Sequence, residues 1–241
     1  MEELRAKDQL LMQQSRQAAM GEMIGNIAHQ WRQPLNAIGL TVQSLLFIND
    51  AGELGKDVLE GTVKSAMEII NYMSSTIDDF RNFFRPDRER VPFHLESAVT
   101  RSLGLIGASL KERGITIDIV KNADPLVIGF PNEFSQALIN ILLNARDAFE
   151  ERRVKKPRLV IVVDKTNNGV GVVTVNDNAG GIAEDIIDKV FEPYFTTKRP
   201  DKGTGVGLFM AKSIIEKSMG GSLTVRNTGN GAEFRMVMAE C

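Results

Sequence analysis

One of the two histidines of this 241-residue chain lies where its side chain could do chemistry. His29 sits within the stretch Gly25–Asn36, on a segment whose apolar residues recur with helical spacing. An imidazole with an unperturbed pKa near ~6.5 is mostly neutral, and so nucleophilic, around neutral pH. Pro34 follows five residues later and predicts a bend near the histidine. A helical histidine is more often packed or solvated than reactive, so His29 needs support from elsewhere.

A second set of polar residues falls on one face of a helix predicted over residues 132–151, for which Asn132 is a candidate N-cap. Asn140, Asn144 and Asp147 are spaced i, i+4 and i+7. Asparagine is unfavourable inside helices, so two on one face indicate a use for their amide oxygens. Oxygen ligands suit Mg²⁺, which takes its remaining ligands from water and substrate phosphates. The alternative is a solvated polar face.

A third candidate follows the strand predicted at 171–175, where the chain enters an acidic turn. The carboxylate of Asp177 could accept a hydrogen bond from an exocyclic amine such as that of adenine. Gly180 and Gly181 would allow a flat ligand to approach closely. The alternative is an ordinary turn, since these residue types favour turns in any case.

The fourth candidate is the glycine-rich turn Gly203–Gly207, which opens a helix predicted over 205–219. Its backbone N–H groups would favour phosphate. Such a turn alone is weak evidence, and it lacks the preceding strand of a dinucleotide-binding fingerprint. The polar, basic residues 194–202 before it could form a short lid over phosphates or a plain solvated loop.

Two long amphipathic helices precede these motifs. Apolar residues step by three and four through residues 20–45 and again through 59–84, and a turn is predicted at 49–55. Two helices alone bury little surface, so residues 1–85 are predicted to be a hairpin that forms a dimeric four-helix bundle. Residues 1–18 would be an incoming signalling helix. The alternative is a monomeric hairpin packed on the rest of the chain.

The remainder of the chain alternates predicted helices and strands. Residues 86–92 are charged and proline-containing and are predicted to be a linker. Residues 93–241 would form the second domain, with helices at 95–110, 132–151 and 205–219. Strands are predicted at 115–120, 159–163, 171–175, 222–225 and 233–238, and the last two are predicted to form a hairpin around the turn Asn227–Gly231. The fold class is therefore α plus α/β, a helical hairpin followed by an α/β sandwich.

Composition narrows the function classes. A hydrophobic content of 43% allows a core, and a formal charge of −2 argues against nucleic-acid binding. The only cysteine is Cys241, and no run of about 18 apolar residues exists to span a bilayer. We expect a cytoplasmic chain without membrane contact of its own, or the soluble part of a membrane-bound sensor whose N-terminal input module is missing.

The motifs together, in their order along the chain, resemble the H, N, G1, F and G2 boxes of two-component sensor histidine kinases. The F box corresponds to Phe191–Phe195, and the resemblance covers residues 15 to 240. It implies a dimerisation and phosphotransfer hairpin followed by a Bergerat-type ATP-binding domain. The residues His29-Gln-Trp-Arg-Gln-Pro-Leu-Asn36 also resemble one subfamily pattern.

The resemblance implies a role for each matching residue. His29 would accept the phosphoryl group from ATP and pass it to an aspartate of a response-regulator receiver domain. Asn144 would bind Mg²⁺, and Asp177 would select adenine. The implied nucleotide-binding residues are Asn140, Asn144, Asp147, Asp177, Gly181, Ile182, Tyr194, Lys198, Lys202, Gly203, Thr204, Gly205, Val206, Gly207 and Leu208.

The residues around His29 depart from the family in one respect. A carboxylate commonly follows the phosphoacceptor, but here Gln30 does, and an amide cannot take the imidazole proton. Gln33 shares the His29 face, and the resemblance implies that it orients water for dephosphorylating the regulator. Arg32 could pair with phosphate or make a polar contact within the bundle.

Two rival functions remain. ATP-hydrolysing relatives usually carry a glutamate that activates water at the position of Asn140, and an amide cannot act as that base. This favours transfer to a protein residue over hydrolysis. The second rival is a non-catalytic dimeric scaffold that only senses nucleotide, and the complete set of boxes argues against it.

Overall fold

The computed structural model describes residues 10, 21, 31–83, 87, 89–198 and 205–238. The chain divides into two compact units, of which one spans Gly21–Phe84 and the other contains Arg85–Cys241. Each is described by itself.

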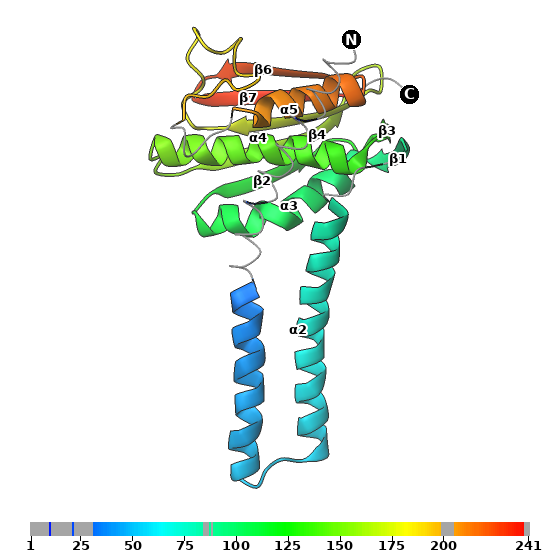
Figure 1. Ribbon diagram of the computed structural model, residues 1–241, viewed down its shortest axis with the longest axis vertical. Helices are drawn as coiled ribbons and strands as arrows, with labels where there is room; N and C mark the ends of the chain where they lie inside the picture. The colour runs from blue at the N-terminus through cyan, green and yellow to red at the C-terminus, as the bar shows by residue number, and fades with distance from the viewer. Residues whose placement is uncertain are drawn as a thin grey trace. The chain divides into compact units, whose positions relative to one another are not determined.

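The first unit is a helical hairpin (Figure 1). Residues 31–50 are helical, and α2 (Lys56–Phe83) returns after a turn in which Gly52 adopts a φ of 72°. The bend expected from Pro34 falls near residue 30, outside the described residues. Many large apolar side chains of the hairpin are exposed, among them Leu40, Leu46, Phe47, Val63, Met67, Ile70 and Ile77.

The second unit is organised on a mixed five-stranded sheet in the order β2-β4-β5-β7-β6. Its strands are β2 (Thr116–Lys121), β4 (Arg158–Lys165), β5 (Gly171–Asp177), β6 (Ser222–Thr228) and β7 (Gly231–Val237). β2 pairs parallel with β4, and the other neighbours are antiparallel. Alternating burial along β4 and β5 shows that one face of the sheet carries the core.

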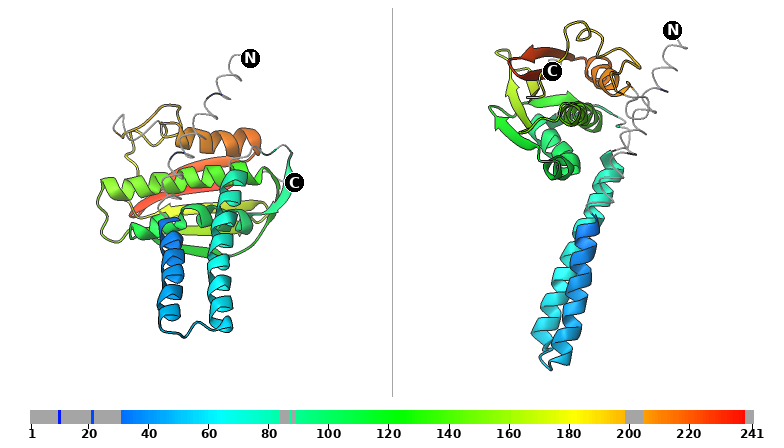
Figure 2. Two further views of the ribbon diagram at one scale, coloured as in Figure 1. Left: turned by 60° about the horizontal axis from the view of Figure 1, so that its bottom comes forward. Right: turned by 90° about the vertical axis from the view of Figure 1, so that its left-hand side faces the viewer.

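Helices cover that face in a second layer (Figures 1 and 2). They are α3 (Leu95–Glu112), α4 (Pro131–Glu151) and α5 (Gly207–Ser213), which continues into the π-helical turn η1 (Ile214–Ser218). The buried residues at their junction with the sheet include Ile106, Leu138, Ile141, Leu159, Ile161, Val173, Phe234 and Met236. This is the helix-on-sheet sandwich predicted from the sequence.

A small second sheet joins the segment before α3 to the segment before α4. β1 (Val91–His94) pairs antiparallel with β3 (Leu126–Gly129). The ring centroids of Phe93 in β1 and Phe134 in α4 lie 5.9 Å apart. Neither strand was predicted, because each has four residues and β1 contains Pro92. Val91 and Pro92, placed in the linker by sequence, therefore belong to a strand of the second unit.

The start of α4 differs from expectation. Asn132 was a candidate cap for this helix, but the helix begins at Pro131, and its N-cap residue, Phe130, makes no side-chain capping bond. The Asp87 carboxylate instead accepts hydrogen bonds from the N–H groups of Asn132 and Glu133, at 2.8 Å and 3.3 Å. The cap is supplied from 45 residues earlier in the chain, beyond the reach of local pattern reading.

Candidate functional site

Helix α4 carries a polar face through the interior of the second unit. Asn140 is only 7% exposed, and its amide nitrogen has no hydrogen-bond partner among the described residues. The first residue of α5 lies next to it, since a Cβ added to Gly207 would be 3.9 Å from Asn140 Cγ. A buried donor left unpaired costs about 1–3 kcal/mol, which marks Asn140 as a group kept for a ligand.

One and two turns further along α4, Asn144 and Asp147 are half-buried. The side chain of Asn144 has no hydrogen bond to the described part of the chain, so its amide oxygen is available. Asp147 is engaged, because Lys198 donates to Oδ2 at 2.5 Å and Arg146 Nε to Oδ1 at 2.9 Å. The structure thus joins two predicted site residues, Asp147 and Lys198, that are 51 positions apart.

Asp177 ends β5 on the buried face of the sheet and is 9% exposed. Its Oδ1 accepts hydrogen bonds from the N–H groups of Ala179 at 2.8 Å and Ala232 at 3.2 Å. Burial raises the pKa of the carboxyl, while these two hydrogen bonds and the Arg152 charge act in the opposite direction. No donor in the described ranges reaches Oδ2, which leaves one oxygen for an external amine.

The turn after Asp177 is held by the β6–β7 hairpin. Asn227 accepts from the N–H of Ile182 and donates to its carbonyl, both at 2.7 Å. Gly180 and Gly181 have φ values of 90° and 78°, so the turn needs glycine at both positions. A Cβ at Gly181 would also lie 2.7 Å from Asn227 Oδ1.

Two further residues that shape this turn were missed by sequence reasoning. Gly231 lies so close to the strand that a Cβ there would be 1.7 Å from the Asp177 carbonyl oxygen. Arg152, just after α4, donates to the Ala179 carbonyl at 2.5 Å. Asn227 and Gly231 had been assigned only to a hairpin turn, and no local signal tied them or Arg152 to Asp177.

The glycine-rich turn is described from Gly205 onward. Gly205 has a φ of 66°, and a Cβ there would lie 2.4 Å from the Tyr194 carbonyl carbon, so the first residue of the predicted lid lies against the glycine-rich turn. Tyr194 itself has a φ of 65° and is 63% exposed. Val206 is buried against Met210, and Leu208 is half-buried on α5.

Several predicted site residues lie outside the described ranges: His29, Gln30, Lys202, Gly203 and Thr204. In the hairpin, Arg32 and Gln33 are exposed on the helix of residues 31–50. Within the second unit, the structure brings together three pairs of predicted residues: Asn140 and Gly207, Asp147 and Lys198, and Tyr194 and Gly205. Asp177, Gly181 and Ile182 lie together at the end of β5 and in the turn that follows it.

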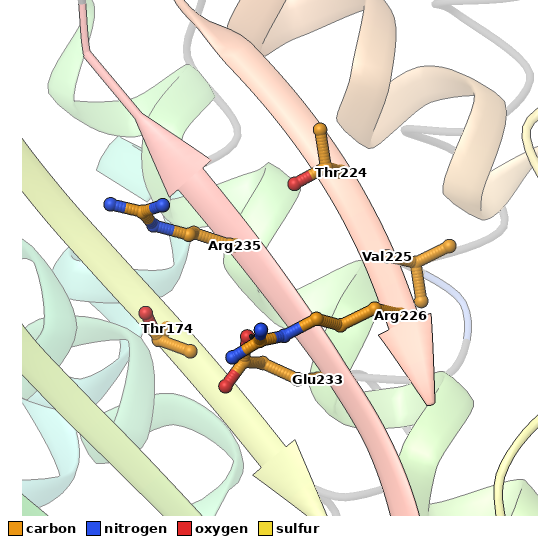
Figure 3. Close-up of a pocket in the computed structure, with 6 residues that line it drawn as sticks. All are labelled: Thr174, Thr224, Val225, Arg226, Glu233 and Arg235. Carbon is orange, nitrogen blue, oxygen red and sulfur yellow. Dashed lines mark hydrogen bonds and ion pairs between the residues drawn. The ribbon is translucent and has the colours of Figure 1, made fainter. Parts of the chain in front are cut away.

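A hollow of about 360 Å³ lies on the sheet and includes none of the predicted residues (Figure 3). It is lined by Thr174, Thr224, Val225, Arg226, Glu233 and Arg235. Glu233 hydrogen-bonds Arg226 at 2.5 Å, which raises the pKa of the guanidinium. We place the candidate site at α4, α5 and the Asp177 turn instead, where buried polar groups are left for a ligand.

Comparison with known proteins agrees with this geometry. Residues 129–240 match the family described as histidine kinase-, DNA gyrase B- and HSP90-like ATPase. Residues 19–89 match the His Kinase A phospho-acceptor domain. The fold and site thus define a domain of this ATPase type, joined to a phospho-acceptor hairpin.

Individual relatives and solved structures are similar to all or part of this chain. The two-component sensor PprA of Pseudomonas aeruginosa is 31% identical over 96% of this chain and 25% of its own length. The nucleotide-free catalytic domain of histidine kinase ThkA is 26% identical, with a TM-score of 0.55 over 62% of this chain and 95% of that one. ThkA in complex with the response regulator protein TrrA matches 99% of this chain and 66% of that one, with a TM-score of 0.52 and 20% identity. This last likeness concerns the fold alone.

The chain accordingly carries the phospho-acceptor and ATPase modules of the two-component histidine kinases. It spans between a quarter and about half of the curated relatives it matches. Among the described residues, none of the helices is long and apolar enough to cross a membrane.

Replacing Asp177 by Asn should separate stability from nucleotide binding. Folding raises the pKa of Asp177, so its ionised carboxylate lowers the free energy of unfolding at any pH above the folded pKa. This destabilisation disappears as pH falls toward the ordinary pKa of 3.8. Asp177→Asn keeps an oxygen for the two N–H groups but removes the buried charge. We expect a higher melting temperature than wild type at pH 7, a gap that narrows on acidification, and lost affinity for adenine nucleotides.

Asp164→Asn is the matched control. Asp164 is half-buried on β4, and the Asn122 side chain and the Lys165 N–H lower the pKa of its carboxyl. Its contribution to stability is present at neutral pH and fades as pH falls through the folded pKa, so this variant should melt lower at pH 7 and bind nucleotide normally. Undiminished binding in Asp177→Asn, measured by calorimetry, would contradict the assignment.

Proposed function

We propose that the chain is the catalytic core of an ATP-dependent protein-histidine kinase, which phosphorylates itself and then an aspartate of a response regulator. The observation that carries the proposal is the Asp177 carboxylate, buried at the end of β5 with one oxygen committed to protein N–H groups. Burying a charge of this kind is unfavourable without a ligand that uses the other oxygen. The exocyclic amine of adenine is such a donor.

The residues of α4 would act on the phosphate end of ATP. Asn144 offers an amide oxygen, which is the hard ligand that Mg²⁺ prefers, and the triphosphate and waters would supply the rest. The bound metal would balance charge on the transferring phosphoryl group. Asn140 would donate its unpaired amide N–H toward the phosphates or their water, and Lys198 lies close enough to Asp147 to join this end of the site.

The proposed reaction transfers one phosphoryl group twice, first from ATP to His29 and then from His29 to the receiver aspartate. A neutral ring nitrogen of His29 attacks the γ-phosphorus, a P–N bond forms, and the bond to the β–γ bridging oxygen breaks to release ADP. The ring loses a proton, which Gln30 cannot accept, so water or another base must take it. A receiver aspartate oxygen then attacks the phosphohistidine and restores the free imidazole.

Asn140 also bears on the rival hydrolytic function. Hydrolysis needs a general base near the γ-phosphate to take a proton from water. The side-chain amide of Asn140 cannot accept a proton at neutral pH. A nucleotide-sensing scaffold would need Asp177 but would give no phosphohistidine. The labelling experiment below separates these alternatives.

Incubation with Mg²⁺ and ATP that is radioactive at the γ position should label the protein through acid-labile, alkali-stable phosphate. His29→Ala should remove the label, because no other residue would accept it. His94→Ala is the matched control, since it removes the only other histidine, whose Nδ1 lies 2.9 Å from Asp124. Asn144→Ala should reduce labelling at limiting Mg²⁺. Label that survives in His29→Ala would exclude the proposed acceptor.

The hairpin would be the dimer interface and the platform for the receiver. Val63, Met67 and Ile70 follow one another at steps of four and three on α2, and they are 50%, 48% and 43% exposed. A second copy that covers this stripe would complete a four-helix bundle. Response-regulator binding is proposed from the phospho-acceptor match and from the complex of ThkA with TrrA.

Val63→Glu or Ile70→Glu should convert the dimer to monomer, because a buried carboxylate at a helix interface lacks a partner. Ser65→Glu adds the same charge on the opposite face of α2 and should leave the dimer intact. Light scattering coupled to size-exclusion chromatography measures the mass directly. A wild-type monomer at every concentration would favour the alternative of a hairpin packed on its own chain.

Gln33 is proposed to orient the water that dephosphorylates the regulator. Its exposed position on the helix of residues 31–50 leaves the amide accessible to a docked receiver. Gln33→Ala should lose most of this phosphatase activity while it keeps autophosphorylation. A full rate of dephosphorylation of a phosphorylated receiver domain in this variant would rule the role out.

A further inference from the structure

The segment immediately before β1 makes two long-range attachments to the helices of the second unit. Asp87 binds the N–H groups of Asn132 and Glu133 at the start of α4. Arg90 Nη2 donates to the carbonyl of Met219 at 3.2 Å and to that of Ile128 at 3.3 Å. The partners lie 45 and 129 positions away from Asp87 and Arg90, respectively, so a segment predicted to be a linker is anchored at two remote points.

Asp87 supplies what α4 lacks locally. The first turn of a helix leaves N–H groups without partners, and an acidic side chain there is favourable. Phe130 at the N-cap gives no side-chain bond, so the carboxylate of Asp87 satisfies two of these groups. Asn140 lies eight residues beyond Asn132, about 12 Å along the same helix.

Arg90 acts at the far end of the neighbouring helix. Met219 follows η1, which continues α5 without interruption, and a cation near a helix C-terminus is favourable. The other end of that helical stretch begins at Gly207, beside Asn140. α4 and α5 pack against each other, so the two anchors hold the outer ends of a helix pair that carries the candidate site.

We propose that Asp87 and Arg90 are positioning residues that set the placement of α4 and of α5–η1 for nucleotide binding. The nucleotide part of this inference rests on the proposed function. Neither side chain is one of the candidate ligand-binding groups, and each acts through a helix end. Helix α2 ends at Phe83, four residues before Asp87, so a displacement passed along the chain from α2 reaches these anchors before any residue of the site.

The first test compares Asp87→Ala with Asp87→Asn in the full chain. Asparagine keeps an oxygen for the N–H groups and should bind the non-hydrolysable ATP analogue AMPPNP with Mg²⁺ nearly as wild type does. Alanine removes the cap and should weaken this affinity about three- to tenfold. Asp164→Ala, which removes a hydrogen bond to Asn122 away from α4, is the control for general loss of stability. Equal affinities for Asp87→Ala and Asp164→Ala would overturn the proposal.

The second test needs no nucleotide. Hydrogen exchange in Asp87→Ala should become faster through residues 139–144 of α4, and in Arg90→Ala through residues 207–213 of α5. Asp164→Ala should change neither region. Faster exchange confined to residues 132–135 in Asp87→Ala would reduce Asp87 to a local cap and overturn its positioning role. If wild type fails to bind AMPPNP, the proposed function fails, whereas hydrogen exchange still decides whether the anchors place the helices.

Discussion

The burial of one carboxylate constrains much of the second unit. Asp177 could sit at a strand end in water, but β5 places it on the core face, where desolvation raises its pKa. Its Oδ1 then needs donors, and the N–H groups of Ala179 and Ala232 bring the following turn and the start of β7 to it. Because β7 must approach so closely, Gly231 cannot carry a side chain. One buried carboxylate thus constrains a turn, a strand and a hairpin.

Helix α4 also buries a polar side chain where an apolar one would be more stable. Leu138, Ile139, Ile141 and Leu142 are fully buried, which makes this helix the centre of the core. Asn140 is placed among them with an amide nitrogen that has no partner among the described residues. An apolar side chain would suit the folded chain better, so the asparagine is best explained by a ligand. Buried polar groups that are left unpaired identify this site better than the hollow on the sheet does.

Residue patterns predicted what depends on periodicity, and they missed what depends on contacts between distant segments. The β-branched apolar runs Leu159–Val163 and Gly171–Val175, separated by a turn, identified two core strands, and helical spacing identified α3 and α4. Asn132 was the candidate cap of α4 because capping rules are local, whereas the carboxylate that accepts from the first N–H groups belongs to Asp87. The π-helical turn η1 gives no signal in apolar spacing, which predicted a continuous α-helix to Met219.

The two units differ in how completely they bury their apolar side chains. In the second unit, the sheet and its helix layer bury their apolar faces against each other, and residues such as Phe134, Leu138 and Phe234 are almost inaccessible. The hairpin has only two helices, so each can cover only part of the other's apolar stripe, and Phe47 remains 75% exposed. A contiguous apolar stripe on a soluble helix is unfavourable unless another surface covers it. The second unit therefore buries its apolar core within a single copy, whereas the hairpin leaves apolar side chains exposed. A second copy of the chain would cover this stripe with an identical stripe of its own.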